Sequence, residues 1–405
     1  MTTPRRGTPC SIRLPGWASR QEAALAKKRG RRGGKDKGRG AYSSQDGMGR
    51  LRRAFAPGRV RDTGLERIGD DEDALEAHES VERRTNAGEG LIAKFNRLAR
   101  DTADADGTPG TVCGFDGVGM MVRLADGSEH ACQVRAVLKK MLSGVKSPLV
   151  VGDDVRVDDL EGDPVVTALL PRRNQLARAD SHNKALEHIF AANIDHLVIV
   201  AALAMPELKT GLIDRYLTIA HHNEIEPVIV LNKIDLAHYD DIRELYASLG
   251  YQVFATDAAR GTGDIEALRS FLRGHSCVFA GQSGVGKSSL IKALYPAIDL
   301  RIGDVSTVQR KGRHTTTASR SYLLPDGGCL IDTPGIRECG ITGMTPLDVA
   351  LLYPDIAHFH QDCRFNDCSH RHEPDCAVVS AVEAGALDPR RYFSYVSIID
   401  EDLTA

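Results

Sequence analysis

The chain has 405 residues, of which 42% are hydrophobic, 5% aromatic and 26% charged, and its net charge is −3. This length is enough for two or three domains with their own cores. No apolar run approaches the roughly 18 residues of a membrane-spanning helix. The small net charge hides an asymmetry, because residues 1–60 carry 16 Lys and Arg against three acidic residues. The sequence therefore predicts a basic arm attached to an acidic body.

The first hundred residues predict an extension without a core. Residues 27–40 hold five glycines and no apolar residue, which predicts disorder. The Lys and Arg there could neutralise nucleic-acid phosphates; a solvated extension, a start codon assigned too early and an organellar transit peptide are the alternatives. Residues 62–86 are acidic, and apolar residues at 91, 92, 95 and 98 then have the spacing of one amphipathic helix. We expect residues 1–104 to be largely disordered.

Residues 105–172 predict a small β-barrel. Short strands are expected at 111–115, 119–124, 129–134, 150–157 and 165–169, with a turn at Asp126-Gly127. Five short strands within about 60 residues favour an oligonucleotide-binding barrel, and a fragment of a β-sandwich is the alternative.

Residues 173–345 alternate between apolar strands and helices. We expect strands at 196–201, 227–231, 251–255, 276–280 and 329–331, and helices at 212–222, 266–272 and 288–294. Short apolar strands separated by helices predict a parallel sheet covered on both faces. Nucleotides bind such sheets at the carboxyl ends of the strands.

A phosphate-binding loop follows the strand expected at 276–280. Its glycines allow backbone N–H groups to close around phosphates, and the helix that follows adds positive potential. Lys287 would reach the outer phosphates, and Ser288 would supply a hydroxyl ligand to magnesium. The nucleotide-binding residues expected here are Gly281, Gln282, Ser283, Gly284, Val285, Gly286, Lys287, Ser288 and Ser289.

A guanine-reading segment, Asn232-Lys233-Ile234-Asp235, comes about fifty residues before the phosphate loop. A carboxylate offers two acceptors that match the paired N–H donors of guanine, which adenine lacks. Ala258 is expected to turn its backbone N–H toward the base, although Asp257 stands where GTPases usually carry Ser. In an ordinary small GTPase the phosphate loop comes first. The inverted order predicts a circularly permuted GTPase domain.

Asp332-Thr-Pro-Gly335 ends the strand at 329–331, where the magnesium-side carboxylate of a phosphate-loop enzyme is expected. The preceding Gly312-Arg-His-Thr-Thr-Thr317 predicts a switch loop, in which one of the threonines, with Thr316 preferred, contacts magnesium. Ile336 follows Gly335 and cannot orient the attacking water. His314 could position that water, and a structural or phosphate-contacting role is the alternative. We therefore expect slow hydrolysis without a partner.

Three cysteines near the C-terminus, Cys363, Cys368 and Cys376, have His370 and His372 between them. Three thiolates and one imidazole are the ligands of a closed structural zinc site. Either histidine could be the fourth ligand, and unpaired buried thiols are the alternative to a metal. The remaining cysteines are scattered, as in reduced proteins, so we expect a cytoplasmic setting.

Together, the inverted motif order, the Gly-Arg-His-Thr-Thr-Thr loop, the preceding barrel and the trailing Cys-x4-Cys-x-His-x5-Cys pattern resemble the ribosome small subunit-dependent GTPase A family. The stretches Leu170-Pro-Arg-Arg-Asn174, Ala191-Ala-Asn-Ile-Asp195 and Cys363-Arg-Phe-x-Asp-Cys368 also match. The similarity covers residues 108–400 and leaves residues 1–100 outside.

The resemblance implies a GTPase that acts in late maturation of the small ribosomal subunit and that the subunit stimulates. It implies a barrel and a zinc module that grip ribosomal RNA, and His370 as the fourth zinc ligand. Within a C-terminal module at 346–405, the residues themselves predict short helices at 377–387 and 390–399, and we expect the apolar stripe of Tyr392, Phe393, Val396 and Ile399 to pack on the zinc module. We expect a monomer that uses GTP or GDP, Mg²⁺ and one Zn²⁺. The other functions considered are a nucleotide-gated RNA-binding module with incidental hydrolysis, and a phosphate-loop kinase or ATPase.

Overall fold

The computed structural model describes residues 91–102, 106–115, 119–141, 149–179, 187–298, 320–332 and 344–400. The basic arm and the expected disorder of residues 1–90 lie outside the described residues. So do His314, Thr316 and Gly335. None of the described helices is long and apolar enough to cross a membrane.

The expected β-barrel is present and closed. Its strands are β1 (Thr108–Phe115), β2 (Met120–Leu124), β3 (Glu129–Val134), β4 (Asp154–Asp158) and β5 (Val165–Leu169), in the order β1-β2-β3-β5-β4. Only the β3–β5 pairing is parallel. The strand expected at 150–157 starts later because Gly152 has a φ of 94° and the Val150 N–H donates to the Asp153 carboxylate at 2.8 Å. A short helix that was not predicted, α4 (Ala136–Met141), follows β3.

The helix expected near residue 91 is α3 (Leu91–Thr102), and it packs on this barrel. Phe95 and Ala99 are buried with the barrel interior. The Arg172 guanidinium lies 3.8 Å from the centre of the Phe95 ring and forms a buried ion pair with Asp153. The Asn96 side chain exchanges two hydrogen bonds with the backbone of Arg172. The predicted helix is thus part of the barrel's core.

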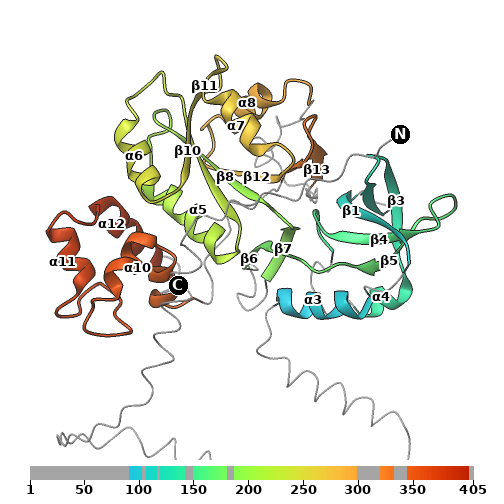
Figure 1. The fold of residues 1–405 in the computed structure, drawn as a ribbon, viewed down its shortest axis with the longest axis horizontal. Helices are drawn as coiled ribbons and strands as arrows, with labels where there is room; N and C mark the ends of the chain where they lie inside the picture. The colour runs from blue at the N-terminus through green and yellow to red at the C-terminus, as the bar shows by residue number, and fades with distance from the viewer. Residues whose placement is uncertain are drawn as a thin grey trace, which may run out of the picture. The chain divides into compact units, whose positions relative to one another are not determined.

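The expected parallel sheet has seven strands in the order β11-β10-β9-β8-β12-β14-β13 (Figure 1). All its pairings are parallel except those of the edge strands β11 and β13. The strands are β8 (His196–Ala202), β9 (Glu226–Asn232), β10 (Gln252–Asp257), β11 (Thr262–Gly263), β12 (Ser276–Ala280), β13 (Arg320–Leu323) and β14 (Cys329–Asp332). Each predicted strand is confirmed to within two residues at either end.

Four helices cover the sheet: α5 (Thr210–His222), α6 (Asp240–Ser248), α7 (Ile265–Leu272) and α8 (Lys287–Leu294). Alternate residues of β8 separate the two faces, since side chains on a strand point to opposite sides. Leu197 and Ile199 belong to the core that α5 and α6 cover. Val198 and Val200 belong to the core beneath α7 and α8. The parallel sheet is therefore buried on both faces, as the apolar strands predicted.

Some elements had no clear sequence signal. The hairpin of β6 (Gln175–Ala179) and β7 (Glu187–Ala192) precedes the sheet, and α6 lies between β9 and β10. The edge strand β13 contains Arg, Ser, Tyr and Leu rather than an apolar run. Edge strands need only one buried face, so their composition is a weak signal.

The C-terminal residues form four short helices: α9 (Pro346–Leu351), α10 (Pro354–His360), α11 (Ala377–Glu383) and α12 (Pro389–Ile398). The prediction that Phe393 belongs to the packed stripe of α12 is wrong, because its side chain is 66% exposed. Arg391 is buried instead and pairs with Asp214 of α5 and with Asp355 of α10. The boundaries at 104, 172 and 345 stay predictions.

Candidate functional site

The phosphate loop lies between β12 and α8, and two of its positions admit only glycine. Gly281 has a φ of 142° and Gly286 a φ of 97°, which disfavour other residues. A Cβ on Gly281 would lie 2.2 Å from the Val200 carbonyl oxygen, and one on Gly286 would lie 2.3 Å from the Asn232 amide nitrogen. The loop is therefore shaped by close packing against β8 and β9.

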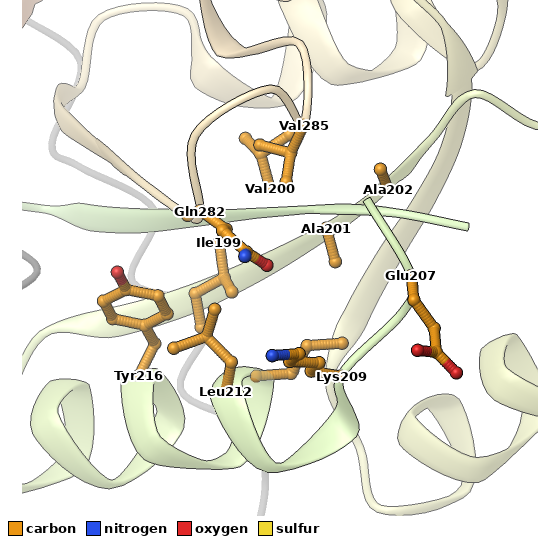
Figure 2. A pocket seen from close by; sticks show the side chains of 12 residues that line it. Ile199, Val200, Ala201, Ala202, Glu207, Lys209, Leu212, Tyr216, Gln282 and Val285 are labelled. Atoms are coloured by element: carbon orange, nitrogen blue, oxygen red, sulfur yellow. The ribbon is translucent and has the colours of Figure 1, made fainter. Parts of the chain in front are cut away.

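Side chains within the loop take different directions. The Lys287 ammonium donates to the carbonyl oxygens of Gly281 at 2.7 Å and Gln282 at 3.0 Å, so it is held across the loop. Figure 2 shows the Gln282 side chain directed into a small cleft against α5, which Ile199, Leu212 and Tyr216 also line. The Gln282 amide thus lies in this cleft, while the carbonyl oxygen of the same residue accepts from Lys287.

Asn232 links the guanine-reading segment to the phosphate loop through its side-chain hydrogen bonds. Its amide nitrogen donates to the Val285 carbonyl oxygen at 2.8 Å. Its amide oxygen accepts from the Thr256 hydroxyl at 3.1 Å and from the Ala258 N–H at 3.0 Å. The Ala258 N–H, expected to face guanine, is directed at Asn232 instead. The contribution of Ala258 in this structure is to hold Asn232.

Lys233 and Asp235 continue the segment beyond β9. The Lys233 ammonium donates to the carbonyl oxygens of Gly284, at 2.8 Å, and of Met205. It therefore bridges the phosphate loop and the segment after β8. The half-buried Asp235 side chain forms an ion pair of 2.9 Å with Arg260.

Asp332 ends β14, beside the strand that leads into the phosphate loop. Strands β14 and β12 are paired in parallel, so their carboxyl ends lie at the same edge of the sheet. Burial raises the pKa of the Asp332 carboxyl above its ordinary value. A half-buried carboxylate at this edge is a suitable ligand for a cation.

Of the two candidate histidines, the structure brings His370 together with the three cysteines, and the four ligand atoms lie within 4.8 Å of one another. Sγ of Cys363 is 3.9 Å from Sγ of Cys376, and Nδ1 of His370 is 3.3 Å from the latter. Tetrahedral zinc with bonds of about 2.3 Å to sulfur places its sulfur ligands about 3.8 Å apart. The cluster therefore fits a metal ion of this size.

The surroundings of the cluster favour His370 over His372. His370 is fully buried, and burial lowers its pKa to about 4, so the imidazole is neutral, as a ligand must be. The exposed His372 donates its backbone N–H to the Glu373 carboxylate. Sequence reasoning missed His360, whose Nδ1 lies 3.1 Å from Nε2 of His370. Its position three residues before Cys363, at the end of α10, was the available signal.

The comparisons with known proteins match this geometry. The family model described as RsgA GTPase matches residues 169–342. The small ribosomal subunit biogenesis GTPase RsgA of Saccharophagus degradans is 40% identical over 306 residues, which cover 72% of this chain and 86% of that protein. The RsgA of Pseudomonas aeruginosa is 42% identical over 296 residues, covering 72% and 84%. The chain belongs to the RsgA GTPase family.

Two solved structures show the same architecture as this RsgA-family chain. YjeQ from Thermotoga maritima aligns with a TM-score of 0.60 at 33% identity, covering 74% of this chain and 99% of that one. YloQ, described as a circularly permuted GTPase, aligns with a TM-score of 0.58 at 26% identity, covering 73% and 95%. The predicted permutation is confirmed, and as a member of the RsgA GTPase family the protein is a hydrolase that acts on GTP.

Proposed function

We propose that this protein hydrolyses GTP to GDP and phosphate in the late maturation of the small ribosomal subunit, and that the subunit stimulates the hydrolysis. Relatives at 40% and 42% identity have small ribosomal subunit biogenesis in their names. The expected slow turnover of the isolated protein follows from Ile336, which cannot orient water.

One observation carries the nucleotide part of this proposal. The carboxyl ends of β9, β10 and β12 meet at a single edge of the sheet, where hydrogen bonds join their loops through Asn232 and Lys233. Base-reading and phosphate-binding segments that are far apart in the chain thus form one site.

The roles of individual residues follow from their positions. Residues 281–289 bind the phosphates, Asp235 binds guanine, and Asn232, Lys233, Ile234 and Ala258 shape the base pocket. Ser288 binds magnesium directly, and Asp332 supplies the carboxylate on the magnesium side. Thr316, Gly335 and His314 act from the switch segments, Thr316 on magnesium and His314 on the attacking water.

We assign one zinc ion to Cys363, Cys368, His370 and Cys376. The thiol and imidazole spacings support this assignment, because the 3.9 Å between Cys363 and Cys376 and the 3.3 Å between His370 and Cys376 are close to the separations of ligands around a tetrahedral ion. A closed set of four protein ligands leaves no position for a reacting molecule. The ion would therefore stabilise the C-terminal module rather than take part in hydrolysis.

The proposed partner is ribosomal RNA of the small subunit, which a cytoplasmic monomer grips through the barrel and the C-terminal module. The exposed Phe115 of β1 and Phe365 of the metal-ligand loop offer apolar rings on both parts. Exposed rings of this kind stack on unpaired bases.

The test compares GTP hydrolysis by the purified protein with and without purified small ribosomal subunits. We expect a large increase in turnover with the subunits, and none with large subunits. Co-sedimentation in the presence of a GTP analogue and of GDP measures binding separately. Binding without stimulation would instead indicate an RNA-binding module with incidental hydrolysis, and a preference for ATP would indicate a kinase or ATPase.

A further inference from the structure

Asp257 stands where GTPases usually carry Ser, and the structure shows what accompanies this change. The Asp257 side chain is only 5% exposed, and its carboxylate lies close to that of Asp235. Nη1 of Arg260 is 2.8 Å from an oxygen of Asp257 and 2.9 Å from an oxygen of Asp235. The two carboxylate oxygens are therefore at most about 6 Å apart, a spacing at which like charges repel.

The loop around Asp257 is otherwise well ordered by its own hydrogen bonds. Oδ1 of Asp257 accepts the backbone N–H groups of Ala259 and Arg260 at 3.1 and 3.2 Å. These bonds fix the charge of Asp257 beside the base-reading segment. A serine hydroxyl at this position could donate a hydrogen bond to Asp235, whereas an ionised carboxylate only accepts. Another donor must therefore hold Asp235, and Arg260 is placed to do so.

The ion pair leaves room for a base. Arg260 contacts Oδ2 of Asp235, and in the described part of the chain no hydrogen bond or ion pair reaches Oδ1. A carboxylate has about four lone-pair sites, of which guanine uses two. Arg260 can therefore stay paired with Asp235 while guanine binds.

We propose that Arg260 is a positioning residue for guanine recognition. It neutralises Asp257 and orients Asp235, so that Asp257 and Arg260 together take the place of the serine that GTPases usually carry at position 257. This inference rests on the proposed role of Asp235. Both ion pairs use a single nitrogen of Arg260, Nη1, so a lysine can make them without the planar fork of arginine. The specific requirement is a cation that is shared by two carboxylates.

The test measures the dissociation constant of mant-GDP, with unlabelled GDP and inosine diphosphate as competitors. Inosine lacks the 2-amino group, so the ratio of the two affinities reports how well Asp235 is positioned. We expect Arg260→Ala to weaken GDP binding roughly tenfold and to reduce this ratio. The turnover number at saturating GTP should not change. Arg260→Lys should retain most of the affinity and of the ratio.

The decisive variant is the double substitution of Asp257→Ser with Arg260→Ala. Removing both charges and restoring a hydroxyl should bring GDP affinity back to within about threefold of the original, a coupling that independent sites do not show. The matched control is Arg173→Ala, since Arg173 is 60% exposed and pairs with Asp195 at 2.8 Å at the other end of β8. GDP binding by that variant should not change.

Three outcomes overturn the proposal. If Arg260→Ala binds GDP with unchanged affinity, Arg260 has no part in guanine recognition, and if it binds GDP more tightly, Arg260 blocks the base. If the double variant binds GDP as weakly as Arg260→Ala does, Asp257 has no part in the effect. Arg260 is 64% exposed, so Arg260→Lys should keep the original melting temperature. The melting temperatures of Arg260→Ala and of the double variant are measured beside their affinities, because Asp257 is only 5% exposed. Asp235→Ala separates this inference from the proposed function, because a lack of effect there removes the assignment of Asp235 itself.

Discussion

The nucleotide site and the cysteine–histidine cluster are held in place by different means. The nucleotide site lies at the edge of a seven-stranded sheet whose central strands are buried on both faces. The cluster lies among helices of six and seven residues, which are too short to be stable by themselves. The comparison shows that one site is organised by a hydrophobic core before any ligand binds. The cluster's helices also bury apolar residues against the core beneath α5 and α6, and we expect them to need the proposed zinc ion in addition.

Removal of the metal ion should produce the largest difference between the two regions. Binding of structural zinc is worth about 10 to 16 kcal/mol in small modules, so its loss should unfold residues 344–400. Hydrogen exchange after treatment with a strong chelator should show loss of protection in α10 and α11 and retention in β8 and β9. Cys376→Ser should behave in the same way. Equal protection with and without metal would show that the helices hold the cluster by themselves.

Arg391→Met should give the next largest effect. Arg391, Asp214 and Asp355 form a buried ion-pair cluster between α12, α5 and α10. Loss of the cation leaves two buried carboxylates without a compensating charge, which costs about 3 to 5 kcal/mol. Denaturant unfolding should detect a destabilised C-terminal module.

The control for Arg391 is Arg371→Met, since Arg371 is partly exposed and pairs with Asp400 at the surface. Its loss should change the free energy of unfolding by less than about 1 kcal/mol. A similar cost for both variants would contradict the importance of the buried cluster.

Lys287→Ala should weaken GTP binding roughly 100-fold and leave the fold intact. The ammonium donates to carbonyl oxygens of the loop, whereas the core of the sheet is built from apolar side chains. Lys292→Ala, in the same helix and exposed, is the matched control. Nucleotide titration by calorimetry measures both, and equal affinities would separate the phosphate loop from nucleotide binding.

Asp332→Asn should have the smallest effect on stability and the opposite sign. Burial raises the pKa of Asp332 in the folded protein above the ordinary carboxyl value of the unfolded chain. As the pH rises from the ordinary value to the raised one, ionisation becomes less favourable in the folded protein than in the unfolded chain, which lowers the free energy of unfolding. This decrease in the free energy of unfolding is complete at neutral pH and absent in acid. The variant should therefore be more stable than the original protein at pH 7 and equally stable below pH 3. Lower stability at pH 7 would show that the carboxylate has a stabilising partner.

The sequence predicted most of the fold because the informative segments are local. Apolar strands such as β12 and the glycine-rich loop that follows it can be recognised within a dozen residues. The elements without a prediction of their own include α4, α6, the hairpin β6–β7, and the edge strands β11 and β13. They are short or lie at an edge, where burial places weak demands on composition.

The candidate site was predicted less completely than the fold. The Ala258 N–H was assigned to guanine, whereas it binds Asn232. Phe393 was assigned to a packed face, whereas Arg391 is the buried residue of that helix. Both errors concern the direction of one group, which depends on neighbours that are distant in the sequence.

The sequence by itself determined the inverted order of the GTPase segments, the residue types of the phosphate loop and the set of cysteines. These features follow from residue types and their spacing along the chain, and they can be recognised without three-dimensional coordinates. The tertiary structure brought the expected His370 to the thiols, and only the tertiary structure decided that His360 contacts His370 and that Arg260 lies between Asp257 and Asp235. Ion pairs and ligand clusters form between side chains that the fold brings within about 4 Å, and sequence separation does not specify that distance.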